Sequence, residues 1–419
     1  MREKIIVVGG GFAGLQFARK LNNKTGQKVM MIDKVNHHMF QPLFYQVACG
    51  RIEPSNISFP FRKIFQKSRN IQFRLTEVLE VIPEENKIVC EDGTFNYDKL
   101  VIATGCKTNF FGNDKIANLT FGMKDTQQAI SIRNHVLLTF EKLIIEKKRT
   151  DDGNWNIVIV GSGPTGVELA GAFSEMKKEI LPRDYPHMNF EDLKIILISA
   201  TDFPLASMSE EAQKKSEEYL KEFGVDFIKG EFVTNYDGDK IYTKSGIEIA
   251  TNTVIWAAGV TGNVLDGFQE NKLVHNRYIV DRFNRLEGFE NIYAIGDIAY
   301  METPKYPIGH PQVANVAIHQ AKNLAVNFLK KEGEKWKEYE YNDLGSMATV
   351  GKHRAVVDLP KFNFQGLLAW YLWMFLHLML ILSVKNKIAI FLNWMWSYFN
   401  KDSSLRLIII PKKHDGTEQ

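Results

Sequence analysis

The chain has 419 residues, of which 45% are hydrophobic and 24% are charged, and its formal net charge is +3. This length and composition predict two or three globular domains, and the small charge argues against nucleic acid as a partner. The only cysteines are Cys49, Cys90 and Cys106, and no two have CxxC spacing, so we expect no disulfide framework, a reducing compartment and no metal site.

The first predicted unit is a strand, a glycine turn and a helix over Lys4–Leu21, where a β-branched run precedes helix-spaced apolar residues. Because this strand begins so early, we expect no signal or transit peptide and a cytosolic start for the chain. Gly9, Gly11 and Gly14 form G-x-G-x-x-G directly after the strand. Such glycines let backbone N–H groups approach a pyrophosphate at the helix N-terminus.

Three further elements support a dinucleotide site at this turn. Asp33 ends the next predicted strand, Lys28–Asp33, 19 residues after Gly14, where a carboxylate can bind a ribose 2′-hydroxyl. Each of the other two elements lies at the end of an apolar strand, Lys99–Thr104 in one case and Asn291–Ile295 in the other. Their residues are Ala103, Thr104 and Gly105 in LVIATG, and Gly296 and Asp297 in YAIGDIA.

A second unit of the same kind spans Asn156–Phe173, with Gly161, Gly163 and Gly166 in its turn. We therefore predict a second dinucleotide, the nicotinamide donor of a hydride that a flavin accepts. Glu168 lies in the first helical turn, and two roles stay open for it. It either complements the helix dipole or places a carboxylate near the nicotinamide and the flavin.

The strand Lys194–Ser199 ends in a serine at the position where an acid would favour NADH over NADPH. Serine repels neither nucleotide, and Asp202 lies beyond the strand end. No arginine follows that would clamp a 2′-phosphate. We expect relaxed donor choice, with NADH favoured and NADPH permitted.

Strands alternate with helical stretches as far as Thr253–Ala257 and Asn291–Ile295, which predicts parallel sheets covered on both faces. The expected fold class is α/β, with two doubly wound Rossmann-like domains and a C-terminal, membrane-associated amphipathic helical region. The predicted domains are an FAD domain at 1–112 and 266–345, an NAD(P)H domain at 113–265 and a membrane-anchoring region at 346–419.

The C-terminal region holds 19 uncharged residues from Gly366 to Val384. A buried core helix and a single membrane span are both alternatives here. Basic residues flank the run on both sides, with Lys361 before it and Lys385 and Lys387 after it, so no one-sided charge bias indicates a span.

The next segment favours a helical hairpin lying in a bilayer surface over Gln365–Phe399. On a helix, one face is apolar, and Asn393, Ser397 and Asn400 form a narrow polar stripe opposite it. The flanking lysines would attract anionic lipid. The apolar face comprises Ile388, Phe391, Leu392, Met395 and Phe399.

With both glycine turns placed, the chain resembles flavoproteins that have two dinucleotide-binding domains. Among these it resembles the type II NADH dehydrogenases, and the resemblance extends from Lys4 to about Leu407. The resemblance implies non-covalent FAD, oxidation of NAD(P)H and reduction of a membrane quinone without proton pumping. It also implies a homodimer, which we expect at the cytoplasmic face of a bacterial cell membrane. The stretches that carry it are Asn36–Gly50, Thr253–Val260, Ser346–Asp358 and Phe391–Phe399.

The resemblance also implies site residues. Glu168 matches a glutamate on the nucleotide side that is important for turnover. The FAD residues it implies are Gly9, Gly11, Phe12, Ala13, Gly14, Asp33, Lys34, Gln41, Tyr45, Val78, Ala103, Thr104, Gly105, Gly296 and Asp297. The NAD(P)H residues are Gly161, Gly163, Pro164, Thr165, Gly166, Ser199, Ala258 and Gly259.

One motif departs from the family. The quinone segment A-Q-x-A-x-Q has Asn315 and His319 in place of its glutamines, with Gln320 adjacent. His319 can donate a hydrogen bond or a proton to a quinone, or it can be a helix residue bonded to its neighbours. We assign catalytic roles to Glu168, Asn315, His319 and Gln320.

Three other functions are alternatives to NADH:quinone oxidoreduction. A sulfide:quinone reductase would need redox cysteines, and the three cysteines show no recognisable pairing. A soluble NAD(P)H diaphorase would not need the C-terminal hairpin. A non-catalytic flavoprotein would bind NADH and signal through a partner.

Overall fold

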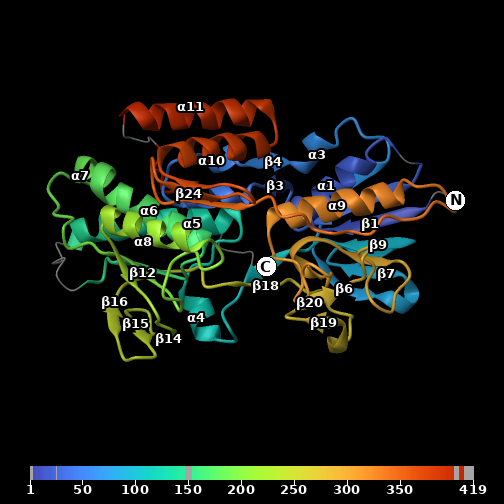
Figure 1. Cartoon of the computed structure of the whole chain (residues 1–419), viewed down its shortest axis with the longest axis horizontal. Helices are drawn as coiled ribbons and strands as arrows, with labels where there is room; N and C mark the ends of the chain where they lie inside the picture. Colours follow the sequence, from blue (N-terminus) through green and yellow to red (C-terminus); the bar gives the residue numbers. More distant parts are fainter. Residues whose placement is uncertain (1–2, 25, 147–152, 401–404, 410–419) are drawn as a thin grey trace. The chain divides into compact units, whose positions relative to one another are not determined.

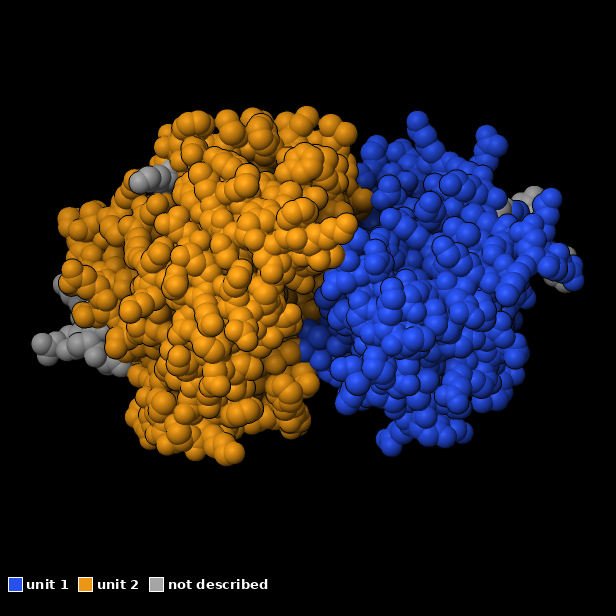
Figure 2. All heavy atoms as spheres, in the orientation of Figure 1, with its two compact units in different colours: residues 1–39, 58–107, 260–344 blue, residues 40–57, 108–259, 345–419 orange. Residues whose placement is uncertain are grey.

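The computed structural model describes residues 3–24, 26–146, 153–400 and 405–409. It divides into two compact units, which Figure 2 shows in different colours. The first unit comprises residues 1–39, 58–107 and 260–344, and the second comprises residues 40–57, 108–259 and 345–419.

The first unit is built on a five-stranded parallel sheet in the order β21-β9-β1-β2-β5. Strand β1 carries the sequence KIIVV, with four consecutive buried residues, as expected for a strand covered on both faces. The strands of this sheet that the sequence predicts are confirmed to within two residues at each end, and β5, which was not predicted, adds the edge strand. The bounds are β1 (Lys4–Val8), β2 (Lys28–Asp33), β5 (Ile71–Leu75), β9 (Lys99–Ile102) and β21 (Ile292–Ala294).

Different structures cover the two faces of this sheet. Helices α1 (Phe12–Leu21) and α9 (Ala314–Phe328) pack against each other over one face (Figure 1). The other face packs on an antiparallel sheet, and buried residues of both sheets share one hydrophobic core. The strands of that antiparallel sheet are β6 (Val78–Ile82), β7 (Lys87–Cys90) and β8 (Gly93–Asn96).

The second unit repeats this plan with a parallel sheet in the order β13-β12-β11-β17. Helices α6 (Pro164–Glu175) and α8 (Glu210–Phe223) pack together and against this sheet, and an antiparallel β14-β15-β16 sheet shares the core on the other side. The strands are β11 (Ile157–Val160), β12 (Ile195–Ile198), β13 (Val225–Ile228), β17 (Thr253–Trp256), β14 (Val233–Tyr236), β15 (Lys240–Thr243) and β16 (Glu248–Ala250).

The C-terminal segment belongs to the second unit and does not form a separate body. Its antiparallel sheet consists of β23 (Ser346–Thr349), β24 (Ala355–Asp358) and β25 (Asn363–Gln365). Strand β23 packs against α6, and the carboxylate of Asp358 accepts hydrogen bonds from the backbone N–H and hydroxyl of Ser209, at 2.6 and 2.8 Å. Ser209 is the N-cap of α8, so β24 is tied directly to the start of that helix.

Residues 40–57 also belong to the second unit, although their position in the chain would place them with the first. Their helix α2 (Phe44–Ala48) packs against α5 (Thr126–Glu146) and α6. Tertiary packing of this buried helix therefore determines the boundary, which chain order does not predict.

Two C-terminal helices, α10 (Leu367–Leu380) and α11 (Val384–Asn400), lie side by side (Figure 1). Both turn apolar side chains away from the protein. In α11, Ile390 is fully buried whereas Ile388 is 54% exposed. The predicted apolar face is confirmed, and all five of its residues are exposed. Among the described residues, no helix combines the length and the hydrophobicity that crossing a bilayer requires.

Three hydrogen bonds also anchor the protein-facing side of α11. Asn386 is buried and its Nδ2 donates to the Ser55 carbonyl at 3.4 Å. The Trp394 indole N–H donates to Gln46 Oε1 at 2.8 Å. The side chain of Lys387 donates to the Met379 carbonyl at 2.8 Å, so this lysine binds the end of α10.

Replacing Ile390 with alanine should destabilise the protein by about 2–5 kcal/mol, because a fully buried isoleucine loses its packing. The matched variant Ile388→Ala changes an exposed residue of the same helix and should cost less than about 0.5 kcal/mol. Chemical denaturation in detergent would measure both. Equal losses would mean that α11 does not pack through the side that carries Ile390.

Candidate active site

The first glycine turn joins β1 to α1 and leaves space at the helix N-terminus. A Cβ on Gly14 would lie 1.8 Å from the Gly9 carbonyl oxygen, so only glycine permits this close packing. By contrast, a Cβ on Gly11 would meet nothing within 4 Å. The turn therefore packs tightly where helix meets strand and stays open where a phosphate would approach.

Asp33, at the end of β2, lies beside this turn. Its Oδ2 accepts the Gly10 N–H at 2.6 Å, and its Oδ1 accepts the Val35 N–H at 2.9 Å. Burial raises the pKa of Asp33, and the two backbone hydrogen bonds oppose that shift. Lys34 points to solvent, where it pairs with Glu77 at 3.5 Å.

The A-T-G and G-D segments follow the ends of β9 and β21, which are neighbouring strands of the same sheet. Thr104 Oγ1 donates to the Asn263 carbonyl at 2.7 Å. The Asp297 carboxylate accepts a hydrogen bond from the Cys106 thiol at 3.0 Å, and the Asp297 carbonyl accepts one from Gln312 Nε2 at 2.9 Å. Sequence reasoning missed Cys106 and Gln312 as neighbours of Asp297, because only the fold brings these positions together.

The other predicted FAD residues are distributed as follows. Phe12 makes an edge contact with the His38 ring, and Ala13 is buried beside Gly296. Val78 is packed into the core of the first unit. Gln41, which is exposed, and Tyr45, which is buried, belong to the second unit.

The predicted quinone segment forms the first turns of α9. Gln320 is fully buried, and its Oε1 accepts the Gly296 N–H at 2.8 Å, so it positions the G-D turn. Asn315 and His319 are half-buried on the same helix. Burial, aided by the charge of Lys322, lowers the pKa of His319, which favours its neutral form.

The second glycine turn borders a cavity of about 430 Å³ in the second unit. A Cβ on Gly166 would lie 1.8 Å from the Gly161 carbonyl oxygen, which is the same close packing as in the first turn. Pro164 and Thr165 are exposed at the start of α6. Of the residues predicted for NAD(P)H, those that line the cavity are Gly161, Gly163, Ser199, Ala258 and Gly259.

Ser199 lines this cavity but is only 2% exposed. Its hydroxyl bonds Ser162 Oγ at 2.6 Å and Thr201 Oγ1 at 2.9 Å, and it accepts the Thr201 N–H at 3.1 Å. These three bonds use the hydrogen-bonding capacity of the Ser199 hydroxyl within the protein.

Glu168 is the fifth residue of α6 and is 9% exposed. Burial raises its pKa to about 8, although a hydrogen bond from the Thr349 backbone opposes the shift. Glu168 is therefore largely protonated at neutral pH. The Thr349 hydroxyl lies 3.2 Å from the Tyr45 hydroxyl, so Thr349 links Glu168 to Tyr45.

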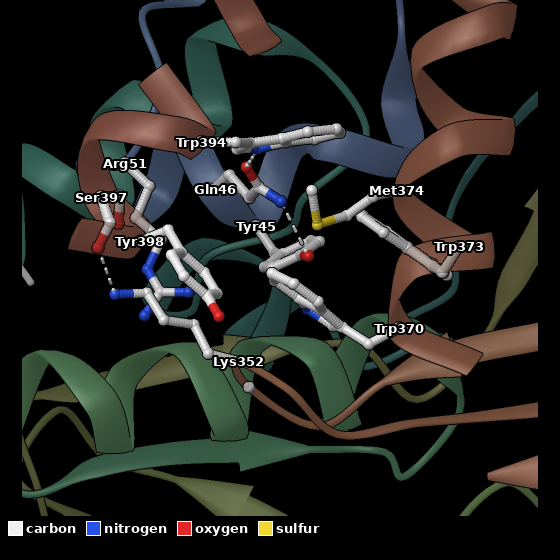
Figure 3. Close-up of a pocket in the computed structure, with 11 residues that line it drawn as sticks. Tyr45, Gln46, Arg51, Lys352, Trp370, Trp373, Met374, Trp394, Ser397 and Tyr398 are labelled. Atoms are coloured by element: carbon white, nitrogen blue, oxygen red, sulfur yellow. Dashed lines mark hydrogen bonds between the residues drawn. The ribbon is translucent and has the colours of Figure 1, made fainter. Parts of the chain in front are cut away.

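Tyr45 lines a second, narrow cavity of about 40 Å³, which we call the aromatic slot (Figure 3). Helices α10 and α11 supply its aromatic rings, and Gln46 hydrogen-bonds both Tyr45 and Trp394. Arg51 is buried at the slot in an ion pair with Glu175. The lining residues are Tyr45, Gln46, Arg51, Gly351, Lys352, Trp370, Trp373, Met374, Trp394, Ser397 and Tyr398.

The three cysteines are free thiols. Burial raises the pKa of Cys49 to about 12 and that of Cys90 to about 11. Thiols held in the neutral form are poor nucleophiles. Neither of these two buried thiols is suited to attack a sulfide or disulfide substrate.

Comparison with known proteins assigns this arrangement to a class. Residues 3–321 match the family described as "Pyridine nucleotide-disulphide oxidoreductase", which covers most of the chain. The chain therefore belongs to the class of flavin- and pyridine-nucleotide-dependent oxidoreductases that two glycine turns on parallel sheets define. Residues 344–401 match the "NDH2 C-terminal domain".

The chain belongs, within this class, to the type II NADH:quinone oxidoreductases. It is 31% identical to "Type II NADH:quinone oxidoreductase Ndh" of Mycobacterium tuberculosis over 95% of this chain and 89% of that protein. The Staphylococcus aureus type II NADH:quinone oxidoreductase is 26% identical over 85% and 89%. The fold matches NDH2 from Plasmodium falciparum, solved with NADH, with a TM-score of 0.89 and 20% identity over 98% and 100% of the two chains. The predicted family, fold class and enzyme activity are thereby confirmed.

We expect the Glu168 carboxyl to lose its proton near pH 8, because burial raises its pKa to about that value. Infrared difference spectra of the parent against Glu168→Gln should show a protonated carboxyl band that disappears with this midpoint. Since the folded-state pKa lies above the ordinary value of 4.5, the parent should lose stability relative to Glu168→Gln as pH rises from about 4.5 through about 8. A band lost near pH 4.5 would contradict the burial argument.

Proposed function

We propose that this type II NADH:quinone oxidoreductase holds FAD on its first glycine turn and binds NADH, with NADPH as a permitted donor, in the 430 Å³ cavity. We further propose that it reduces a quinone at a lipid surface. The observation that carries the proposal is the combination, in one chain, of two glycine turns on parallel sheets and a helix pair with outward apolar faces.

The first turn fits the pyrophosphate of FAD. Gly11 borders open space at the N-terminus of α1, where N–H groups and the helix dipole favour an anion. Asp33 holds the turn in shape through Gly10 and retains acceptor capacity for a ribose hydroxyl. Gln312, Gln320 and Cys106 position the G-D turn, which we assign to the flavin side chain.

Bound FAD supplies a two-electron relay that accepts hydride from the nicotinamide and returns the electrons to the quinone. The chain's own residues bind the donor, exclude water and supply protons. Quinone reduction needs two protons, of which NADH brings one as hydride and the medium brings the other. Glu168, protonated at neutral pH, can release a proton, and Thr349 and Tyr45 extend from it toward the aromatic slot.

We propose that the quinone approaches through the aromatic slot, because flat rings stack on tryptophan and tyrosine side chains. Lys352 extends across one side of the slot, with its ammonium group on the Ser397 carbonyl at 3.1 Å (Figure 3). Asn315 and His319 stay candidates for binding the quinone carbonyl groups, as the family motif implies.

The outward faces of α10 and α11 support attachment to a bilayer surface. Large apolar side chains line both helices, Lys385 is exposed in the first turn of α11, and Lys361 is exposed just before β25. Such a surface is costly in water and favourable among lipid headgroups. The exposed apolar residues of the pair are Leu367, Leu368, Tyr371, Phe375, Met379, Leu380, Val384, Ile388, Phe391, Leu392, Met395, Trp396, Tyr398 and Phe399.

The family resemblance supports two further proposals, a homodimer and a place on the cytoplasmic face of a bacterial cell membrane. Sedimentation of the protein in detergent would measure the first. Protease protection in sealed vesicles of known orientation would measure the second.

Purified protein should show flavin absorbance, and anaerobic NADH should bleach it in one rapid phase. Adding quinone should restore the oxidised spectrum with one quinol formed per NADH consumed. Extraction with acid should release FAD, and release of another flavin would contradict the assignment. Protein that binds FAD but is not bleached by either nucleotide would refute the donor site.

Changing Leu392 to aspartate should weaken binding to vesicles roughly tenfold or more, because an exposed leucine that enters the bilayer contributes about 1.5–3 kcal/mol. Activity with a long-tail quinone in vesicles should fall in parallel. Activity with a water-soluble quinone should not change. Cosedimentation with anionic vesicles gives the binding constant.

The matched control is Leu119→Asp, which places the same charge at an exposed leucine of α4 (Asp114–Leu119). This variant should bind vesicles like the parent. If both variants bind vesicles like the parent, the α10–α11 face is not the attachment surface.

A further inference from the structure

The donor cavity has one unusual electrostatic property. Among its lining residues in the described part of the chain, Glu231 is the single charged side chain. The others are apolar residues, glycines, serines and a threonine. A 2′-phosphate bound in this cavity would find no lysine or arginine on the wall, and it would find one carboxylate.

Glu231 lies where the adenosine ribose is expected. In this fold the ribose of a dinucleotide sits at the end of the strand that follows the glycine-turn helix, which here is β12. Glu231 follows the adjacent strand β13, and its backbone N–H donates to the Ser199 carbonyl at 2.8 Å. Glu231 thus lies beside the end of β12, where Ser199 occupies the position of the acid that would bind the ribose 2′-hydroxyl.

The carboxylate is held in its charged form. Hydrogen bonds from the Ser245 and Thr243 hydroxyls and from the Ser245 backbone lower the pKa of Glu231. These bonds use part of the acceptor capacity of the carboxylate, which retains room for another donor. Ser199 has no such freedom, because its buried hydroxyl already makes three hydrogen bonds.

Phe232 and Phe111 also line the cavity, and both are strongly exposed for phenylalanine, at 56% and 66%. The Phe111 ring lies against Gly259, after β17, whereas Phe232 follows Glu231 directly in the chain. An exposed aromatic ring offers a stacking surface to a purine. An adenine on the Phe232 ring would bring its ribose toward Glu231.

We propose that Glu231 is the residue that discriminates between the two nicotinamide donors, accepting a hydrogen bond from the ribose 2′-hydroxyl of NADH and repelling the 2′-phosphate of NADPH. This inference rests on the proposed function, since it takes the 430 Å³ cavity as the donor site. It also gives the expected preference for NADH a physical cause and makes that preference stronger than Ser199 alone would allow.

The test compares the FAD-loaded, full-length parent with Glu231→Gln, Glu231→Asp and Asp202→Asn. Calorimetry gives Kd for NAD⁺ and NADP⁺, and steady-state assays with a water-soluble quinone give kcat/KM for NADH and NADPH. Glutamine keeps the size of the side chain and an acceptor oxygen but removes the charge. Asp202 is the nearby carboxylate that does not line the cavity.

In Glu231→Gln, the NADH to NADPH ratio of kcat/KM should fall roughly tenfold or more, and NADP⁺ should bind more tightly by a similar factor. Glu231→Asp should keep most of the preference, because it keeps the charge. In the parent the preference should shrink as KCl is raised, since salt screens the repulsion. In Glu231→Gln it should not depend on salt.

Two outcomes would overturn the inference and are distinguishable from failure of the proposed function. If NADH reduces the flavin but the ratio in Glu231→Gln stays within about twofold of the parent, Glu231 does not discriminate. If Asp202→Asn relaxes the preference for NADH and Glu231→Gln does not, then Asp202 discriminates between the two donors instead of Glu231. If neither nucleotide reduces the flavin of the parent, the proposed function fails together with this inference.

Discussion

The carboxylate of Glu175, buried near the end of α6, holds together three segments that are distant in the sequence. It forms an ion pair with Arg51, which follows α2, and it accepts the backbone N–H of Lys352 in the turn between β23 and β24. Removing one partner of such a buried pair would leave an uncompensated charge, at a cost of about 3–5 kcal/mol. The contacts of Glu175 support the aromatic slot and the position of Tyr45. They also support the surface on which the C-terminal helices pack.

The same region is tightly packed around that pair. A Cβ on Gly171 would lie 2.4 Å from the Gly351 backbone nitrogen, so α6 meets the β23–β24 turn backbone to backbone. Helix α6 therefore carries the second glycine turn at its start, Glu168 in its first turns and the attachment of the C-terminal segment at its end. One helix thus links the nucleotide cavity to the elements that face outward with apolar side chains.

Much of this architecture could be predicted from the sequence, because the β-branched runs before each glycine turn and the apolar stripe of α11 are local patterns. The strands and the exposed face of Leu392 and Phe399 were accessible in this way. Contacts between segments that are distant in the sequence could not be predicted from such local patterns. Residues 40–57 join the second unit through packing, and Gln312 reaches Asp297 across the fold. Glu231 lies in a segment with no motif, and only its place on the cavity wall identifies it.

In α11 hydrophobicity does not predict burial, since Asn386 and Ile390 are both buried while Phe399 is exposed. A ranking of mutational tolerance by hydropathy would therefore misplace Asn386 and Phe399. The buried side chain of Asn386 donates a hydrogen bond to the Ser55 carbonyl and should admit few replacements. Phe399 is 71% exposed, packs little against the protein and should accept most large apolar side chains. Sequence drift in this helix should thus be fastest among its exposed hydrophobic residues and slow at Ile390 and Asn386.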